Sequence, residues 1–436
     1  MVDRNFRVSG TNGHEMYSWC KELFPINRSL TGNGVRETLS YLKVLLPELR
    51  IIDVPSGTKC LDWEIPNEWN ISDAWIRDSS GNTLVNFLEN NLHVMGYSTP
   101  QDMTVSREEL DKHLHSIPSQ PDAIPYVTSY YSQNWGFCLT DQTRKSMSDQ
   151  LYTVYIDSSL KPGSMTYGEL FIKGETTDEI LLTTYVCHPS MANNELSGPA
   201  VLTRIAQCLA QASGLKFSYR ILFLVETIGS IYYISKNLEI LQKNVKAGFV
   251  LTCMGDDRMY SYVPTRDGNC LTDRVAKEVL RNLDAESKIY SWLDRGSDER
   301  QFNSPGVDLP IGSLMRSKYG DYPEYHTSLD DLSVISPSGL LGGFNLIWRA
   351  LEILEKNDYY KVKTLGEPQM GKRGLYPNTS GGDAYQKVKN QMDVISYLDG
   401  KRDLMEIAEI CFVDFDEVWK IVCKMLDVDL VELLDS

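Results

Sequence analysis

The chain has 436 residues, of which 42% are hydrophobic and 23% are charged, and these proportions are typical of a globular protein with more than one domain. Its formal net charge of −16 argues against binding to nucleic acid or to an anionic membrane, since both require a basic patch. No run of about 18 apolar residues predicts a membrane span, and the polar residues 1–19 predict no signal peptide.

The nine cysteines indicate a reducing compartment. None of them forms a C-x-x-C pair, and an odd number without a secretion signal is typical of reduced thiols. We therefore expect a cytoplasmic protein in which most cysteines are small, buried apolar residues.

Two short helices and a strand are predicted at the start of the chain. Apolar residues recur at helical spacing over 13–24 and 34–46, with Pro, Asn and Gly between them. The segment at 51–57 is typical of a strand that ends in a turn. From about 60 to 150 the pattern changes to short alternating runs with turn signals and many aromatic residues, which predicts an inserted β-rich subdomain.

The region 150–365 has the alternating pattern of an α/β domain, and residues 1–60 are predicted to belong to the same domain. Near-continuous apolar strands alternate with helical segments, which is typical of a mixed or parallel sheet covered by helices on both faces. The expected strands are GELFIKG, EILLTTYVC, YRILFLVE, KAGFVLTCM and LPIGSLM.

The C-terminal part is predicted to form a separate unit. Residues 366–386 are rich in Gly and Pro and are expected to be a linker, and 387–436 have the pattern of a winged helix. Residues 391–436 contain twelve acidic and four basic side chains, a net charge of −8. Because a DNA-binding winged helix needs a basic recognition face, we expect this unit to bind a protein partner or a second copy of the chain, and not DNA.

Candidate functional residues follow apolar strands or lie in a flexible loop. His188 ends one apolar run, and a turn with Asn194 and Glu195 follows it. Glu226 ends another, where an acid is costly unless it is paired, hydrogen-bonded or functional, and His326 follows the loop-like GDYPEY. Strand ends of an α/β sheet commonly carry metal or catalytic sites. The structural alternatives are a histidine beside a helix N-cap and a carboxylate at a helix N-terminus.

The order of these residues, with the segments VETIGS and YHTSLDD, resembles the co-catalytic di-zinc aminopeptidases over about residues 165–355. The whole arrangement resembles a bacterial group of aminopeptidase-like proteins, on the segments LFPINRSLTGNGVRETL, CHPSMANNELSGP and VETIGSI. It implies a zinc-aminopeptidase-like α/β fold with an inserted domain and a C-terminal winged helix.

The resemblance also implies roles for the matched residues. His188 and His326 are expected to bind metal, and Glu226 matches the general base. Asn194 stands where the family has a bridging aspartate, and Glu195 is its neighbour. We therefore expect a cofactor of one or two zinc ions.

A second loop is implied to line the substrate cleft. The segment GSDERQF is similar to a Ser-Asp-His-x-x-Phe loop of the family, with Glu299 in place of its histidine. Asp298 and Phe302 of this loop, together with Tyr325, are expected to bind a small peptide or amide substrate.

Three ligand positions have lost the family's carboxylate, and they carry Asn194, Thr227 and Cys253. Two divalent ions about 3.5–4 Å apart need a bridging anion and several charges around them. The sequence therefore leaves open whether one metal, two or none is bound, and whether Glu195 or Asp256 replaces a missing ligand.

Two functions follow from these expectations. The first is a zinc-dependent hydrolase of aminopeptidase type, in which a metal-activated water attacks a peptide or amide bond with Glu226 as general base. The second is a catalytically degenerate binding or scaffold protein linked to polysaccharide biosynthesis. A transcriptional regulator acting through the winged helix is a third, weaker alternative.

Overall fold

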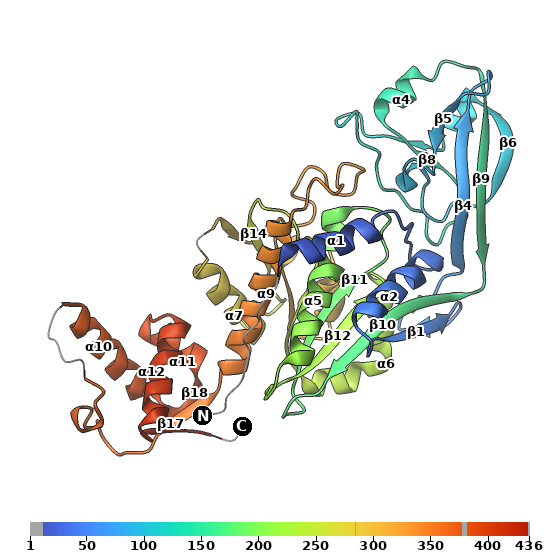
Figure 1. The fold of residues 1–436 in the computed structure, drawn as a ribbon. Coiled ribbons are helices and arrows are strands. Elements are labelled where there is room, and N and C mark those ends of the chain that lie inside the picture. The colour runs from blue at the N-terminus through green and yellow to red at the C-terminus, as the bar shows by residue number, and fades with distance from the viewer. Residues whose placement is uncertain (1–11, 284, 377–381, 435–436) are drawn as a thin grey trace.

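An eight-stranded mixed sheet forms the centre of the molecule, seen here in a computed structural model that describes residues 12–283, 285–376 and 382–434 (Figure 1). The strand order is β1-β10-β12-β11-β13-β16-β14-β15. The inner strands β12, β11, β13 and β16 run parallel, while β1, β10 and β14 each pair antiparallel with a neighbour. The strands are β1 Arg50–Pro55, β10 Ser164–Ile172, β11 Glu179–Tyr185, β12 Ser218–Leu224, β13 Val245–Val250, β14 Tyr260–Val263, β15 Ser287–Ile289 and β16 Ile311–Met315.

Helices cover both faces of this sheet, which confirms the predicted α/β class. Alternate residues of β11 point to opposite sides, so that Ile180 and Leu182 pack in one apolar core and Leu181 in another. Both faces of the strand are buried, which is why its sequence is an almost continuous apolar run. The first core contains α1 Gly13–Leu23, α2 Asn33–Leu45, α5 Ser197–Gln211, α7 Leu271–Arg281 and α9 Pro337–Lys356, and the second contains α6 Ile228–Asn244 and α8 Glu299–Phe302.

The segment between β1 and β10 forms a separate sheet at one end of the molecule (Figure 1). Four antiparallel strands have the order β5-β4-β9-β6, and β9 alternates buried with less buried residues because one face covers a core. The elements are β2 Lys59–Cys60, β3 Trp63–Glu64, β4 Glu68–Arg77, β5 Thr83–Asn86, η1 Asn91–His93, β6 Gln101–Ser106, α3 Arg107–Asp111, β7 Leu114–His115, β8 Phe137–Cys138, α4 Asp141–Ser146 and β9 Leu151–Lys161. We call this part the insert.

The C-terminal unit lies at the opposite end and has the three helices and small sheet of a winged helix (Figure 1). Strand β17 precedes the stretch predicted as a linker, yet it pairs with both strands that follow that stretch. Gly and Pro here mark a loop within the unit. Its elements are β17 Tyr359–Val362, η4 Gly371–Arg373, α10 Gly382–Tyr397, β18 Asp399–Asp403, α11 Leu404–Cys411, α12 Phe415–Asp427 and β19 Val431–Leu433.

Ion pairs join this unit to the central domain. Arg274 of α7 lies 2.9 Å from a carboxylate oxygen of Asp403, and Arg349 of α9 lies 2.6 Å from Asp416. Part of the acidic excess predicted for the unit is therefore neutralised by the main domain.

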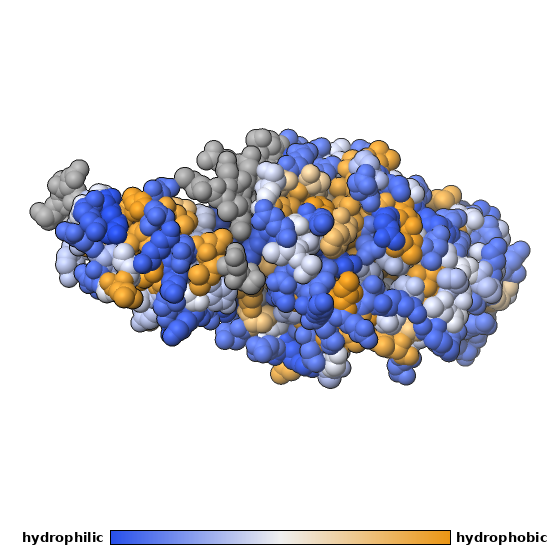
Figure 2. All heavy atoms as spheres, turned by 90° about the horizontal axis from the view of Figure 1, so that it is seen from below, coloured by the Kyte–Doolittle hydropathy of each residue, from blue (hydrophilic) through white to orange (hydrophobic). Residues whose placement is uncertain are grey.

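Figure 2 shows mostly hydrophilic side chains on one face of the molecule, broken by scattered hydrophobic patches. None of the described helices is both long enough and apolar enough to cross a membrane.

Candidate metal and substrate site

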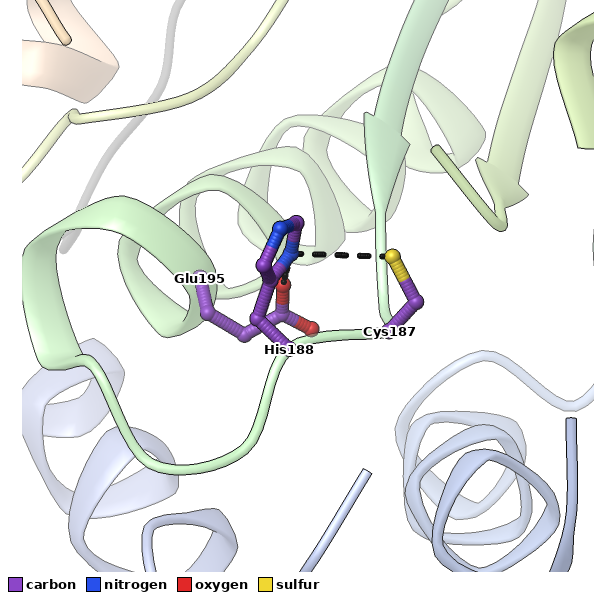
Figure 3. Close-up of side chains that lie close together, drawn as sticks. All are labelled: Cys187, His188 and Glu195. Atoms are coloured by element: carbon purple, nitrogen blue, oxygen red, sulfur yellow. Dashed lines mark hydrogen bonds and ion pairs between the residues drawn. The ribbon is translucent and has the colours of Figure 1, made fainter. Parts of the chain in front are cut away.

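The ring of His188 is held from one side at the end of β11. Its Nδ1 lies 3.0 Å from Oε2 of Glu195 and 3.6 Å from Sγ of Cys187, and Figure 3 shows both side chains meeting the same ring nitrogen. Glu195 belongs to a single π-helical turn, η2 Ala192–Leu196, that runs directly into α5. A histidine whose Nδ1 is fixed by a carboxylate presents Nε2 in a defined direction, as metal-binding histidines do. Here Nε2 lies 3.5 Å from Oε2 of Glu226.

A buried arginine lies behind Glu195 on this side, at a place that no pattern in the sequence indicates. Arg28 lies in the loop between α1 and α2, only 1% exposed. Its Nε donates to the carbonyl of His188 at 2.9 Å and lies 3.5 Å from Oε1 of Glu195. Burial lowers the pKa of Arg28, and Glu195 opposes that shift. The two buried charges therefore compensate each other.

Glu226 lies next to a strained turn. The amide of Ile228 donates to the carbonyl of Glu226 at 2.8 Å, and Thr227 between them has φ 64° and ψ −74°. This is a γ-turn with positive φ, which is rare and strained, above all for a β-branched residue. Asp298 holds the turn, since it accepts from the amide of Thr227 at 2.8 Å and from the hydroxyl of Ser230 at 2.7 Å.

The carboxyl of Glu226 is only partly accessible to solvent. Its side chain is 20% exposed, and the hydroxyl of Ser297 donates to Oε1 at 3.0 Å. Burial raises the pKa of Glu226, while the positive charges of His188 and Arg300 work against that rise. Burial and the charge of Glu226 raise the pKa of Asp298 to about 7. A carboxyl with a raised pKa is suited to proton transfer near neutral pH.

His326 lies opposite His188, on a loop that the insert holds. The two ring centroids are 5.5 Å apart, and Tyr325 stacks on His326 at 4.0 Å. Burial, with a smaller effect from His188, lowers the pKa of His326 to about 3. The imidazole is therefore neutral at pH 7, which is the form that binds a metal.

The insert covers the space between the two histidines. The amide of Tyr126 donates to the carbonyl of His326 at 2.9 Å, and its ring lies edge-on at 5.3 Å from His188 and 5.2 Å from His326. Its hydroxyl is 2.8 Å from that of Tyr130. The sequence showed an aromatic-rich insert but carried no signal that one of its tyrosines would reach the site.

The residues predicted for substrate binding lie at different depths. Asp298 and Phe302 are both fully buried, and Asp298 bonds the strained turn. Tyr325 is partly exposed and contacts His326. Thr227, Arg300, Tyr325 and His326 are among the partly exposed side chains around Glu226.

The three positions without a carboxylate are occupied by hydrogen-bonded neutral side chains. Oδ1 of Asn194 accepts from the hydroxyl of Tyr185 at 3.1 Å. Thr227 contacts Arg300, and burial raises the pKa of Cys253, which keeps its thiol protonated. The carboxylate of Asp256 is also engaged, since it accepts hydrogen bonds from the amide and the hydroxyl of Ser317.

These side chains fit one metal ion better than two. Within the described ranges, the one group of three or more potential ligand atoms within 4.8 Å of each other is Cys187, His188 and Glu195. All three meet at Nδ1 of the histidine, where Arg28 already supplies a positive charge. On the other side, Nε2 of His188 lies 3.5 Å from Oε2 of Glu226, and the centroid of the neutral His326 ring lies 5.5 Å from that of His188. Cys187, Glu195 and Glu226 raise the pKa of His188 well above its usual value against the effect of burial, so a positive charge is favoured at this ring. His188 and His326 are the residues that could hold an ion on this side, with Glu195 orienting the first of them.

Two family models match the chain. One, described as a domain of unknown function (DUF4910), matches residues 17–357, and one described as a winged helix-turn-helix matches residues 357–433. A protein of Clostridium acetobutylicum named "Putative polysaccharide biosynthesis protein with aminopeptidase-like domain" is 44% identical over 435 residues, which are 99% of each chain.

Solved structures share the fold. The crystal structure of a "putative peptidase" from Clostridium acetobutylicum has a TM-score of 0.90 at 44% identity, and covers 97% of this chain and 96% of its own. The zinc aminopeptidase BSAP of Bacillus subtilis has a TM-score of 0.57 at 13% identity, over 79% of this chain and 95% of its own. The aminopeptidase of Aneurinibacillus sp. strain AM-1 has a TM-score of 0.51 at 14% identity, over 78% and 93%. At such low identity these last two likenesses concern the fold alone.

Proposed function

The chain belongs to the DUF4910 family of aminopeptidase-like proteins, and on that premise we propose that it is a metal-dependent hydrolase of a peptide or amide bond with Glu226 as general base. One observation carries the proposal: Nε2 of His188 lies 3.5 Å from Glu226, in a ring that Glu195 fixes from the other side. A nitrogen suited to metal binding and a carboxylate suited to act as a base therefore lie next to each other.

The proposed cofactor is one zinc ion, with His188 and His326 as its protein ligands. When bound, it would activate a water molecule and polarise the carbonyl of the substrate. Glu226 would take the proton of the water and deliver it to the leaving amine, a task for which its raised pKa is suited. Ser297 orients the other oxygen of the same carboxyl.

The proposed substrate is a small peptide or amide, bound where Thr227, Tyr325 and His326 reach the surface. Asp298 and Phe302 support this region from below, and Tyr126 covers it. Water exclusion by the tyrosines would strengthen the electrostatic interactions at the reacting carbonyl. We propose a cytoplasmic location for this activity, in keeping with nine free thiols.

Zinc analysis combined with turnover of aminoacyl amides tests the proposal. We expect about one zinc ion per chain, with an anomalous signal beside His188, and hydrolysis that falls by about 10²–10⁴-fold in Glu226→Gln. Glu64→Gln, an exposed change in the insert, serves as the matched control with unaltered turnover. If the purified protein contains no zinc and hydrolyses none of the amides, the proposed hydrolase function is wrong.

A catalytically degenerate binding or scaffold protein is the second candidate. It is supported by the neutral side chains of Asn194, Thr227 and Cys253, each hydrogen-bonded to its own neighbours. The name of the Clostridium relative suggests polysaccharide biosynthesis as its setting. In that case His188→Ala and Glu226→Gln would leave the cellular role intact, whereas a hydrolase would lose it.

We propose further that the C-terminal unit binds a protein partner or a second copy of the chain. Its acidic excess disfavours a phosphate backbone, and Arg274 and Arg349 of the main domain already pair with its carboxylates. A mobility-shift assay at low salt is expected to retain no DNA. DNA retained there would contradict the proposal.

A further inference from the structure

Arg300 is a cation at the mouth of the site whose hydrogen-bond partners are neutral. It lies in α8, partly exposed, and its Nη2 donates to Oγ1 of Thr227 at 2.9 Å while Nε donates to the carbonyl of Ser297 at 3.2 Å. A guanidinium has five N–H donors in a planar fork. Two of them are engaged here, and the others remain for solvent or a ligand.

No carboxylate lies within 4.0 Å of this guanidinium in the parts of the chain that the structure describes. Glu226 and Asp298 are close enough for Arg300 to lower the pKa of both, yet neither contacts it. Arg220 and Arg274 each lie within 3.0 Å of a carboxylate oxygen, whereas the buried Arg316 has a backbone carbonyl and the ring of Tyr260 as its partners. A partly desolvated cation that no carboxylate contacts is costly.

The strained turn beside Glu226 gives this cation a fixed position. Thr227, at the centre of the γ-turn, presents its hydroxyl to Arg300, and the amide of the same residue is held by Asp298. Strain of order 1–3 kcal/mol persists only where the surroundings enforce it, and it gathers at functional sites. The turn therefore holds a carboxyl, a hydroxyl and a guanidinium side by side at the surface.

We propose that Arg300 is an anion-binding residue of this site, and that the ligand carries a carboxylate or phosphate group bound by this guanidinium beside Glu226. The planar fork matches the two oxygens of either group in a bidentate geometry. In a chain of net charge −16, such a cation would also be needed to admit an anionic ligand. The inference rests on the proposed function only in placing the substrate next to Glu226.

The alternative role for Arg300 is purely structural: it would do no more than hold Thr227 in the turn. The two roles differ in what they predict for binding. A structural arginine would change the free energy of unfolding on substitution but would confer no affinity for anions. An anion-binding arginine confers that affinity, and its loss changes binding even in a variant that folds normally.

Calorimetric titration of the full-length protein, as purified, with inorganic phosphate and separately with malonate tests the proposal. We expect wild-type protein to bind at least one of them, Arg300→Gln to bind it at least tenfold more weakly, and Arg300→Lys to fall between. Arg295→Gln is the matched control, because Arg295 lies five residues away on the exposed surface with its guanidinium over the ring of Trp292. Its affinity is expected to equal that of wild type.

The outcomes separate the two proposals. Wild-type protein that binds neither anion in the millimolar range, or Arg300→Gln that binds as tightly as wild type, overturns the anion site. Should Arg300→Gln prove unfolded by urea titration, the Arg300→Lys comparison decides in the same way. If binding depends on Arg300 but the protein has neither zinc nor turnover, the anion site is supported and only the hydrolase proposal is wrong. The anion with the higher affinity identifies the group as phosphate or carboxylate.

Discussion

The two sides of the His188 ring are built differently. On the Nδ1 side, Cys187, Glu195 and Arg28 are almost completely buried, and the two opposite charges lie 3.5 Å apart. On the Nε2 side, Glu226 is partly exposed, and Arg300 is partly exposed with only neutral groups as its hydrogen-bond partners. The Nδ1 side fixes the orientation of the ring, and the Nε2 side carries charged groups that a ligand can reach.

The difference suits this histidine both to packing and to the chemistry proposed for it. A buried, paired network gives a fixed ring orientation but little freedom to bind anything new. Groups that are strained, partly exposed or unpaired cost stability and are retained where they act on a ligand. Changes on the Nδ1 side are therefore expected to affect stability most, and changes on the Nε2 side to affect binding and turnover.

The largest expected effect on stability comes from Arg28→Met, which leaves Glu195 buried without its counter-charge. We expect a loss of about 3–5 kcal/mol in the free energy of unfolding, measured by urea titration. The double variant Arg28→Met/Glu195→Leu is expected to recover part of it, because neither charge of the pair then remains. Arg50→Met, whose side chain is 74% exposed, should cost less than about 1 kcal/mol. Equal losses for Arg28 and Arg50 would show that the buried ion pair on the Nδ1 side stabilises the fold no more than an exposed one.

The second effect is a pH dependence that comes from Asp330, which anchors the Nδ1 side. Asp330 accepts from the amides of Asn193 and Asn194 and from the hydroxyl of Tyr322. Burial raises the pKa of its carboxyl from 3.8 to about 6. Because the folded pKa lies above the unfolded one, the stabilisation is complete below about pH 4 and is lost as the pH rises through about 6.

Asp330→Asn isolates this contribution. Between pH 4 and pH 7.5, the stability of wild type is expected to fall relative to that of the variant by about 3 kcal/mol. Urea titrations at several pH values measure the difference. Parallel pH profiles for the two proteins would show that Asp330 does not titrate in this range.

The smallest effect is expected at the insert, where Tyr126 covers the Nε2 side. Tyr126→Phe removes the hydrogen bond between its hydroxyl and that of Tyr130 but keeps the ring against both histidines. We expect about 1 kcal/mol of lost stability, measured by thermal unfolding, and a rise in KM with little change in kcat, measured by turnover of the same amide. A fall in kcat with unchanged KM would instead mean that the hydroxyl takes part in the reaction.

Part of the site could be predicted from sequence because its residues lie where strands end. The apolar runs that became β11 and β12 predict buried strands, and polar residues at their carboxyl ends meet at one edge of the sheet. His188 and Glu226 were identified in this way, and Nε2 of one indeed lies 3.5 Å from a carboxylate oxygen of the other. His326 could be proposed only by its motif, because a loop position has no periodic pattern.

The α/β class, the inserted β-rich segment and the winged helix could be predicted from sequence, since hydrophobic periodicity is a local property that survives without tertiary contacts. Three contacts of the site became visible only in the folded chain: Glu195 faces Nδ1 of His188 with Arg28 behind it, Tyr126 reaches the site, and Arg300 lies beside Glu226. Arg28 and Glu195 are separated by more than 160 positions in the chain, and nothing in a local pattern records which buried charge will meet which. The partners of a buried charge are fixed by packing, and packing is decided by the whole fold.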